Sequence, residues 1–447
     1  MRVAETIDRQ TARDWYRRNR RRSREIFDLI RPEAYLDRPI PLRNPVVFYE
    51  GHLPAFSVNT LVKKGLGRPG IDPRFERLFE RGIDPEDASA VPGAPAAWPP
   101  RPEVQAYGDQ ADVRILDAFA NEELENERNP VMRDGLGVFT ILEHEVMHQE
   151  TLGYMWHRLP FDRKEPPASA PRPVTAGPPP ARASVRVPAG PATLGAIPGE
   201  IPFAWDNEFP RLRVDVPAFA IDVHDVSNAD FMDFVDAGGY GRAELWSAEG
   251  WEWLRESATA HPIFWERPDG DGEWRWRGMF EMIPLPPSWP VYVSHAEASA
   301  YARWKGARLP TEAEFHRAAY ATPDGSERLH PWGDDPPDPS RGHFDFAGWE
   351  PMPAGSHPAG QSAWGVHDLV GNGWEWTSTV FRPFPGFAPM ASYPEYSTDF
   401  FDGKHYVMKG ASPATGAEFL RPSFRNWFRS AYPYVYATFR CVRDVGP

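Results

Sequence analysis

Cysteine is almost absent from this chain of 447 residues, in which Cys441 is the only one. A single thiol excludes an internal disulfide and any metal cluster held by several cysteines. A bound metal ion must therefore take its protein ligands from histidine, aspartate or glutamate.

Long apolar runs are absent too. The sequence has no run of about 18 apolar residues that could span a membrane, and its first ten residues, MRVAETIDRQ, have no apolar core of the kind that a signal peptide needs. Positive charge is in deficit, because 63 acidic residues outnumber 49 basic ones and the net charge is −14. This balance argues against nucleic acid or an anionic membrane as a partner, and we expect a cytoplasmic protein.

Proline and tryptophan are plentiful, with 51 and 18 residues. This composition indicates long irregular segments held in place by large aromatic side chains. The prolines are dense between residues 160 and 198, which favours an extended linker. The sequence therefore predicts two domains, residues 1–160 and 186–447, joined by a proline-rich linker at residues 161–185.

Helical spacing of apolar residues marks four segments before the linker, at residues 5–31, 45–65, 105–128 and 135–158. Four helices in one domain predict an antiparallel bundle, and bundles build metal sites from side chains that face inward. After the linker, short strand-like runs and turn signals predict an α+β domain. Two helices are expected there, at residues 296–305 and 311–320, and Thr311 and Glu314 have the spacing of a capping box.

The stretch HEVMHQE, residues 144–150, fits two kinds of metal site. His144 and His148 are about 40° apart around a helix, so both imidazoles can reach one metal ion. The same residues match the HExxH signature of zinc proteases, which needs a third ligand downstream. Position 154 is Tyr, and the linker begins before another helix could supply a Glu. The spacing therefore argues against a zinc protease and favours a third ligand from an earlier helix.

Four histidines precede the linker, and two of them, His52 and His157, could be that third ligand. His157 lies about 220° around the helix from His144 and faces away. His52 remains, and its alternative explanation is a buried side chain that bonds a backbone carbonyl. Three neutral imidazoles on an iron ion would leave positions open for substrate and O2.

Several motifs carry a resemblance to a known family. They are a Gly-His pair on an early helix, His-x-x-x-His-x-Glu on the last helix, FAWDNEFP (203–210), the stretch at 289–315 that ends in RLPTEAEF, WGVHDLVGNGWEW (364–376) and FRNW (424–427). Over nearly its whole length the chain resembles the ergothioneine-type sulfoxide synthases. The resemblance implies a DinB-like four-helix bundle, a formylglycine-generating-enzyme-like domain of C-type-lectin-like fold, and Fe(II) held by His52, His144 and His148. Formylglycine generation itself is excluded, because it needs paired cysteines.

The resemblance also implies substrates. Such enzymes use O2 to form a carbon–chalcogen bond on the imidazole of hercynine, the Nα-trimethyl form of histidine. Asn426 and Trp427 match two residues of the family's Asn-Trp-Asp run, whereas position 428 is Phe, and Met147 replaces a Gln. We expect these four positions to contact substrate, with the Trp427 face toward the quaternary ammonium, although Asn426 and Trp427 could be simple packing residues.

The donor of the chalcogen atom is less clearly marked. Family members that use γ-glutamylcysteine or cysteine hold the donor's carboxylates with arginines, and in the matching segment, residues 90–110, only Arg101 could do so. A neutral sugar donor needs no such clamp, so the chain is most similar to the selenoneine synthase branch. A tyrosine in the loop at 378–401 is the family's proton donor. Here Phe384 and Phe387 lie near the expected place of this tyrosine and Tyr393 and Tyr396 lie further on, so the sequence neither names the tyrosine nor shows that it is present.

The sequence thus favours an oxidoreductase in which Fe(II) and O2 couple hercynine to a 1-selenosugar, giving a hercynyl selenoxide on the way to selenoneine. The alternative is a thiol donor, γ-glutamylcysteine or cysteine, in ergothioneine biosynthesis. A zinc protease and a non-catalytic binding module are further alternatives. We expect a monomer that acts on small molecules.

Overall fold

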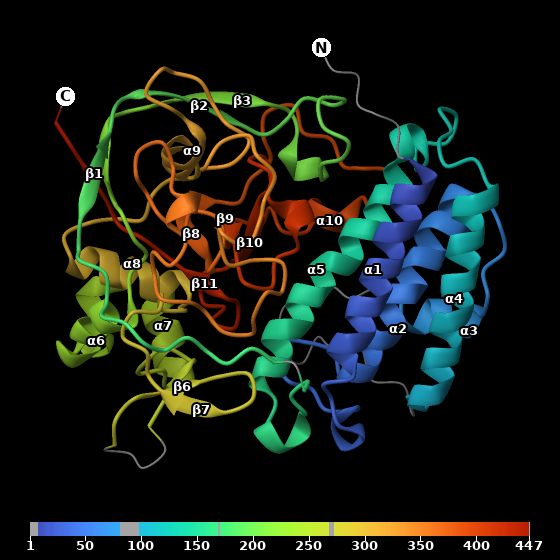
Figure 1. Cartoon of the computed structure of the whole chain (residues 1–447), viewed down its shortest axis with the longest axis horizontal. Coiled ribbons are helices and arrows are strands. Elements are labelled where there is room, and N and C mark those ends of the chain that lie inside the picture. The colour runs from blue at the N-terminus through green and yellow to red at the C-terminus, as the bar shows by residue number, and fades with distance from the viewer. Residues whose placement is uncertain (1–7, 81–97, 169, 268–271, 447) are drawn as a thin grey trace. The chain divides into compact units, whose positions relative to one another are not determined.

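The chain forms two compact units in a computed structural model that describes residues 8–80, 98–168, 170–267 and 272–446 (Figure 1). The helical unit comprises residues 1–169 together with two short later segments, 199–203 and 390–394. The mixed unit comprises residues 170–198, 204–389 and 395–447. In the described residues, no helix is both long and apolar enough for a membrane span.

Within the part of the helical unit that the structure describes, four long helices make up most of the fold. They are α1 (Arg9–Phe27), α2 (Val46–Ser57), α4 (Arg101–Asn121) and α5 (Leu136–Arg158), with the short α3 (Pro73–Leu78) between α2 and α4. All four expected helices are present, although residues 5–7 of the first lie outside the described residues. Both α1 and α2 pack against α4 and α5, around a core that includes Tyr16, Phe56, Leu61, Phe119 and Leu142.

The expected bounds of α4 were wrong at both ends. The helix begins at Arg101, because Pro102 is tolerated in the first turn, where a helix needs no N–H from it. It ends at Asn121 rather than at residue 128. The following residues, EELENER, carry four glutamates, and negative charge is unfavourable at the C-terminal end of a helix.

The chain continues from α2 into a π-helical segment, Val58–Gly65. Pro54 lies inside α2 and cannot donate a backbone hydrogen bond. Wider turns of this kind are frequent at functional sites in proteins. His52 lies on α2 just before this proline.

The described residues of the mixed unit form four small sheets, ordered β1-β4-β12, β10-β9-β8-β11, β2-β3 and β5-β6-β7. The strands are β1 (Ser184–Val187), β2 (Gly190–Leu194), β3 (Leu212–Val216), β4 (Phe219–Asp222), β5 (Trp265–Glu266), β6 (Arg275–Arg277), β7 (Met282–Pro284), β8 (Gly373–Val380), β9 (His405–Ala411), β10 (Asn426–Arg429), β11 (Ala437–Thr438) and β12 (Val442–Asp444). Two of them, β1 and β2, lie within residues 160–198, which the sequence suggested were extended throughout. The alternating run SVRV pairs with β4 despite the surrounding prolines.

Both helices expected in the mixed unit are present, as α8 (His295–Trp304) and α9 (Glu312–Tyr320). The capping box is confirmed: Thr311 Oγ1 accepts from the Glu314 amide at 3.1 Å, and a Glu314 carboxylate oxygen accepts from the Thr311 amide at 2.8 Å. The sequence missed α6 (Asn228–Asp236), α7 (Ala248–Ser257) and the short α10 (Glu395–Thr398).

Buried ion pairs connect the motifs of the mixed unit. Arg425, next to β10, bonds Glu312 at 2.8 Å with both side chains almost fully buried. Arg440 bonds Glu375 at 2.6 Å in the same buried fashion. The first pair ties the residue before β10 to the first turn of α9, and the second ties the residue between β11 and β12 to β8.

Candidate metal centre

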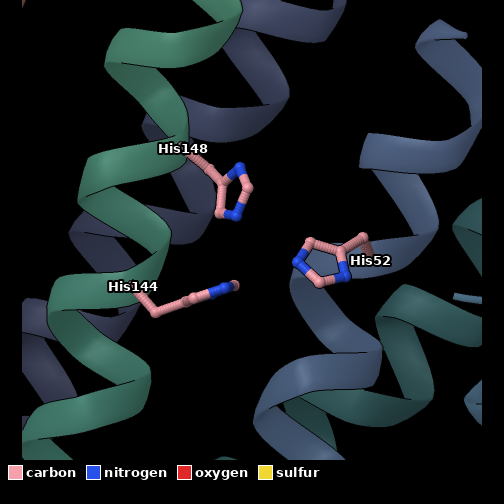
Figure 2. A group of neighbouring side chains, drawn as sticks. All are labelled: His52, His144 and His148. Carbon is pink, nitrogen blue, oxygen red and sulfur yellow. The ribbon is translucent and has the colours of Figure 1, made fainter. Parts of the chain in front are cut away.

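Three histidines converge inside the helical unit. His144 and His148 project from α5 and His52 from α2, and Figure 2 shows the rings pointing toward one another. One ligand atom from each lies within 4.8 Å of the others. The ring centroids of His144 and His148 are 4.5 Å apart, and those of His52 and His148 are 4.9 Å apart. In the described residues, this is the one group of three or more histidine, cysteine or acidic side chains with that spacing.

A backbone carbonyl orients His52. Its Nδ1 atom lies 2.8 Å from the carbonyl oxygen of Phe79. A carbonyl can only accept, so Nδ1 carries the proton and Nε2 keeps its lone pair. The two explanations of His52 are therefore compatible, since histidines that hold metals commonly donate their other N–H in this way.

Burial keeps the three imidazoles neutral. It lowers the pKa of His52 to about 4. It also lowers the pKa of His144 and of His148 well below the ordinary value, and neighbouring histidines add to this shift. Metal ions bind the neutral form of imidazole. The donor set of three neutral nitrogens therefore fits a transition metal such as Fe(II).

Aromatic rings line the group of histidines. Phe56 stacks on His144 with centroids 3.5 Å apart, and Phe48 stacks on His52 at 5.3 Å. The ring centroid of Tyr49 lies 5.9 Å from that of His148. These rings restrict water and limit the rotation of the imidazoles.

The segment 390–394 adds a tyrosine to the aromatic side chains around the three histidines. The centroid of Tyr393 lies 6.2 Å from that of His144 and 5.3 Å from that of Phe56. The Ser392 hydroxyl, 2.7 Å from the Thr140 hydroxyl, fixes the segment on α5. The other candidate, Tyr396, stacks on Trp205 at 3.9 Å within the mixed unit. The structure therefore separates two tyrosines that the sequence could not rank.

The glutamate of the HExxH pattern is engaged elsewhere. A carboxylate oxygen of Glu145 accepts from Arg20 at 3.0 Å and from Ser23 at 2.7 Å. A zinc protease uses this glutamate as its general base. With Glu145 held in an ion pair on another face of α5, the chain lacks the geometry of such an enzyme.

The four expected substrate contacts lie in different units. Met147 is half-buried on α5, whereas Asn426, Trp427 and Phe428 lie on β10. The Trp427 ring stacks on Phe381, with centroids 4.2 Å apart.

The neighbours of Trp427 on β10 make local contacts. Asn426 Oδ1 accepts from the Trp427 amide at 2.8 Å. Phe428 stacks on Tyr432, with centroids 5.0 Å apart. Packing thus accounts for part of what these residues do.

Arg101 is committed to ion pairs. Its guanidinium lies 3.1 Å from Glu50 and 3.2 Å from Asp28. Residues 90–97 of the segment in which the clamp was sought lie outside the described residues. The one arginine of that segment thus already has carboxylate partners inside the protein.

Comparisons with known proteins agree with this architecture. Residues 170–445 match the family described as Sulfatase-modifying factor enzyme 1-like domain. The hercynine oxygenase of Mycolicibacterium thermoresistibile is 37% identical over 417 residues, which cover 91% of this chain and 88% of the relative. That of Mycolicibacterium smegmatis is 35% identical over 450 residues, which cover 98% and 100%. Ergothioneine biosynthesis protein 1 of Neurospora crassa is 30% identical, over 92% of this chain and 55% of the relative.

The class of protein follows from these findings: a helical unit with three converging histidines precedes a sulfatase-modifying-factor-like domain. The formylglycine-generating-enzyme-like domain expected after the linker is confirmed. The chain belongs to the ergothioneine-type sulfoxide synthase superfamily.

Proposed function

We propose that this chain is an Fe(II)-dependent enzyme that uses O2 to join hercynine to a thiol donor, giving a sulfoxide. As a member of its superfamily the chain is an oxygen-using oxidoreductase. Two relatives that align with it over most of their length are named hercynine oxygenases, and a third is named for ergothioneine biosynthesis. These names support hercynine as substrate and a sulfur donor over the selenium donor that the sequence favoured.

The metal assignment is carried by one observation, the convergence of three neutral imidazoles, of which His52 and His144 are buried and His148 is half-buried. We assign His52, His144 and His148 as the ligands of Fe(II), which would supply the activation of O2. Around it, Phe48 and Phe56 exclude water by packing on two of the ligand rings.

The proton donor is assigned to Tyr393. Its ring faces His144 and Phe56, and its phenol oxygen would deliver a proton during bond formation. General acid catalysis of this kind contributes about 10²- to 10⁴-fold to a rate.

Substrate contacts are assigned to Met147, Asn426, Trp427 and Phe428. Trp427 has aromatic neighbours in Phe381, Tyr396 and Phe400. Such a cluster attracts a quaternary ammonium group through the ring faces, and hercynine carries one.

A selenosugar donor remains a second candidate because of Arg101. Its ion pairs with Glu50 and Asp28 oppose a role in holding the carboxylates of γ-glutamylcysteine. A neutral sugar would not need it. We further propose a DinB-like fold for the helical bundle, the domains 1–160 and 186–447 with their linker, and a monomer in the cytoplasm.

The test is O2 consumption by the Fe(II)-loaded protein with hercynine and one of four donors: γ-glutamylcysteine, cysteine, a 1-thiosugar or a 1-selenosugar. Products are identified by mass spectrometry. Turnover with a thiol amino acid supports the main proposal, and turnover with the selenosugar alone supports the second candidate. No O2 uptake with hercynine and any donor would refute both.

A further inference from the structure

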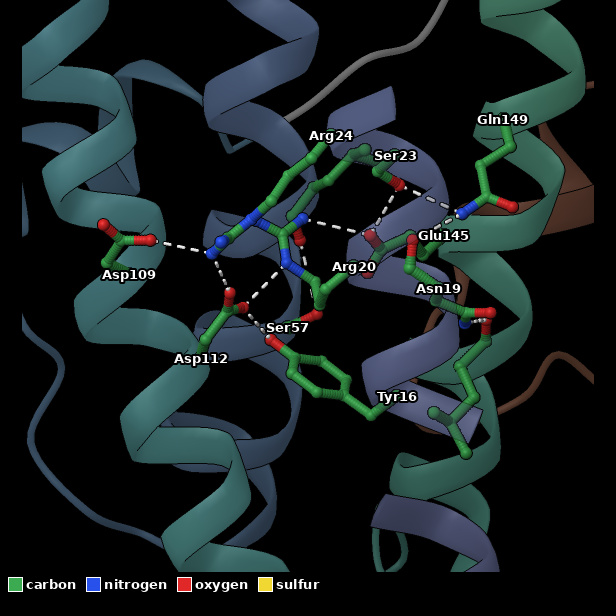
Figure 3. A network of polar contacts seen from close by, with 12 residues as sticks. Tyr16, Asn19, Arg20, Ser23, Arg24, Ser57, Asp109, Asp112, Glu145 and Gln149 are labelled. Carbon is green, nitrogen blue, oxygen red and sulfur yellow. Dashed lines mark hydrogen bonds and ion pairs between the residues drawn. The ribbon is translucent and has the colours of Figure 1, made fainter. Parts of the chain in front are cut away.

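Helix α5 carries two adjacent rows of polar side chains. His144 and His148 form one row, four residues apart. Glu145 and Gln149 form the next row, each about 100° further around the helix. The first row faces His52 (Figure 2), and the second faces α1 (Figure 3). The two rows share one rigid helix, so whatever holds the second row also sets the direction of the first.

The second row is tethered to α1 by buried hydrogen bonds. Glu145 accepts from Arg20 at 3.0 Å and from Ser23 at 2.7 Å. Gln149 Nε2 donates to the Asn19 carbonyl at 2.9 Å and to the Ser23 hydroxyl at 3.0 Å. The Ser23 hydroxyl therefore connects both members of the row.

Three further contacts complete the arrangement. Asn19 Nδ2 donates to the carbonyl oxygen of Leu142 on α5 at 2.9 Å. On its other side, Arg20 Nε donates to Asp112 of α4 at 2.7 Å, which also accepts from Tyr16 at 2.9 Å. The network thus ties α5 to α1 directly and to α4 through Arg20.

Stability alone does not account for this network. Glu145 is 1% exposed, and placing a carboxylate and a guanidinium in a helical core costs more desolvation than apolar packing would. A directional bond, unlike an apolar contact, fixes the rotation of a helix about its own axis. Buried polar groups are known to specify register in this way in coiled coils.

A small rotation matters at a metal site. A ligand atom about 7 Å from a helix axis moves about 0.6 Å when the helix turns by about 5°, whereas metal–ligand distances tolerate about 0.2 Å. We propose that Glu145 and Gln149, held by Ser23 and Arg20, are positioning residues that set the rotation of α5 and so aim His144 and His148 at one metal ion. This inference rests on the proposed metal site.

The test uses Co2+, whose d–d absorption reports ligand geometry, and Fe2+ under anaerobic conditions. Ser23→Ala removes a single hydroxyl from α1, outside α5, and preserves packing. Glu145→Gln keeps the volume of the side chain and removes its charge. Asp112→Asn is the matched control, because it weakens the same network on α4 and leaves the bonds to α5 in place.

We expect Ser23→Ala and Glu145→Gln to weaken Co2+ and Fe2+ binding about 10-fold and to change the d–d spectrum, at temperatures where both are folded. Asp112→Asn should lower the melting temperature but keep the affinity and the spectrum of the unchanged protein. Equal loss of affinity in Asp112→Asn, or wild-type binding in Ser23→Ala and Glu145→Gln, would show that the network only stabilises the fold. If the unchanged protein binds neither ion, the proposed metal site fails, and this inference fails with it.

Discussion

The Nδ1 atom of His52 and the carbonyl oxygen of Phe79 lie 2.8 Å apart, and this bond joins α2 to the residue that follows α3. Gly51, next to His52, lies against the same residue: a Cβ atom at position 51 would be 2.4 Å from the Phe79 ring. The side chain of Phe79 fills the space beside Gly51, and the backbone carbonyl of Phe79 accepts the hydrogen bond that orients the His52 imidazole.

Gly51→Ala should therefore displace Phe79 and release His52 from its orienting bond. We expect Fe(II) affinity to fall about 10-fold, as for other residues that orient a ligand histidine, with the helical content preserved. Anaerobic titration with Fe2+ and circular dichroism measure the two effects. Gly241→Ala, at a site with open space, is the control, and equal affinity in both variants would contradict the prediction.

His52→Ala tests the third ligand directly. Loss of one of three imidazoles should lower the iron content of the purified protein to a trace, because two ligands from one helix hold Fe(II) weakly. Metal analysis measures it, with His261→Ala, in the mixed unit, as the control. Full iron content in His52→Ala would remove His52 from the ligand set.

Tyr393→Phe should keep the metal and lose the proton donor. We expect product formation with hercynine and the accepted donor to fall about 100-fold or more, with unchanged iron content. Tyr396→Phe is the matched control, because it removes a phenol in the mixed unit and keeps the ring that packs on Trp205 and Trp427. A wild-type rate in Tyr393→Phe would exclude its phenol from the reaction.

Protonation of His295 at low pH should destabilise the mixed unit. Burial lowers its pKa from 6.5 to about 3, so between these values the unfolded chain binds a proton that the folded chain does not. The free energy of unfolding then decreases as the pH falls below 6.5, by up to about 1.4 kcal/mol per pH unit for this group. His295→Phe keeps a ring that can stack on Tyr406, whose ring centroid lies 3.7 Å from that of His295. This variant should reduce the dependence of the free energy of unfolding on pH. Urea titrations between pH 4.5 and 7.5 measure it, and an unchanged slope in the variant would contradict the assignment.

The buried pair Arg425–Glu312 should be strongly coupled. Arg425→Met leaves the Glu312 carboxylate buried without its charge partner and should cost about 3–5 kcal/mol. The double variant with Glu312→Leu should recover much of this loss, because neither charge is then buried. Urea unfolding of the four proteins gives the coupling energy, and additive effects would refute it. Arg74→Gln, in a pair that is more than half exposed, should change little.

The helical spacing of His144 and His148 was sufficient to predict that both face one point, because it depends on α5 alone. His52 followed by elimination among four histidines. The carbonyl of Phe79 could not be predicted, because it lies 27 residues away and a backbone group leaves no mark in the sequence. Tyr393 could not be named from the sequence, because Phe384 and Phe387 lie near the expected place and the position of Tyr393 depends on how a long irregular loop runs. The pairing of β1 with β4 was missed because prolines on either side masked a four-residue alternation.

The segment 390–394 has a consequence for the order in which the protein is made. The helical unit consists of three stretches of the chain, and the last of them brings Ser392 and Tyr393 to α5. A ribosome adds about 230 residues after α5 before it reaches this stretch. The three histidines therefore exist in the nascent chain long before the tyrosine reaches them, and a chain cut short upstream would carry the metal ligands without the residue that completes their surroundings.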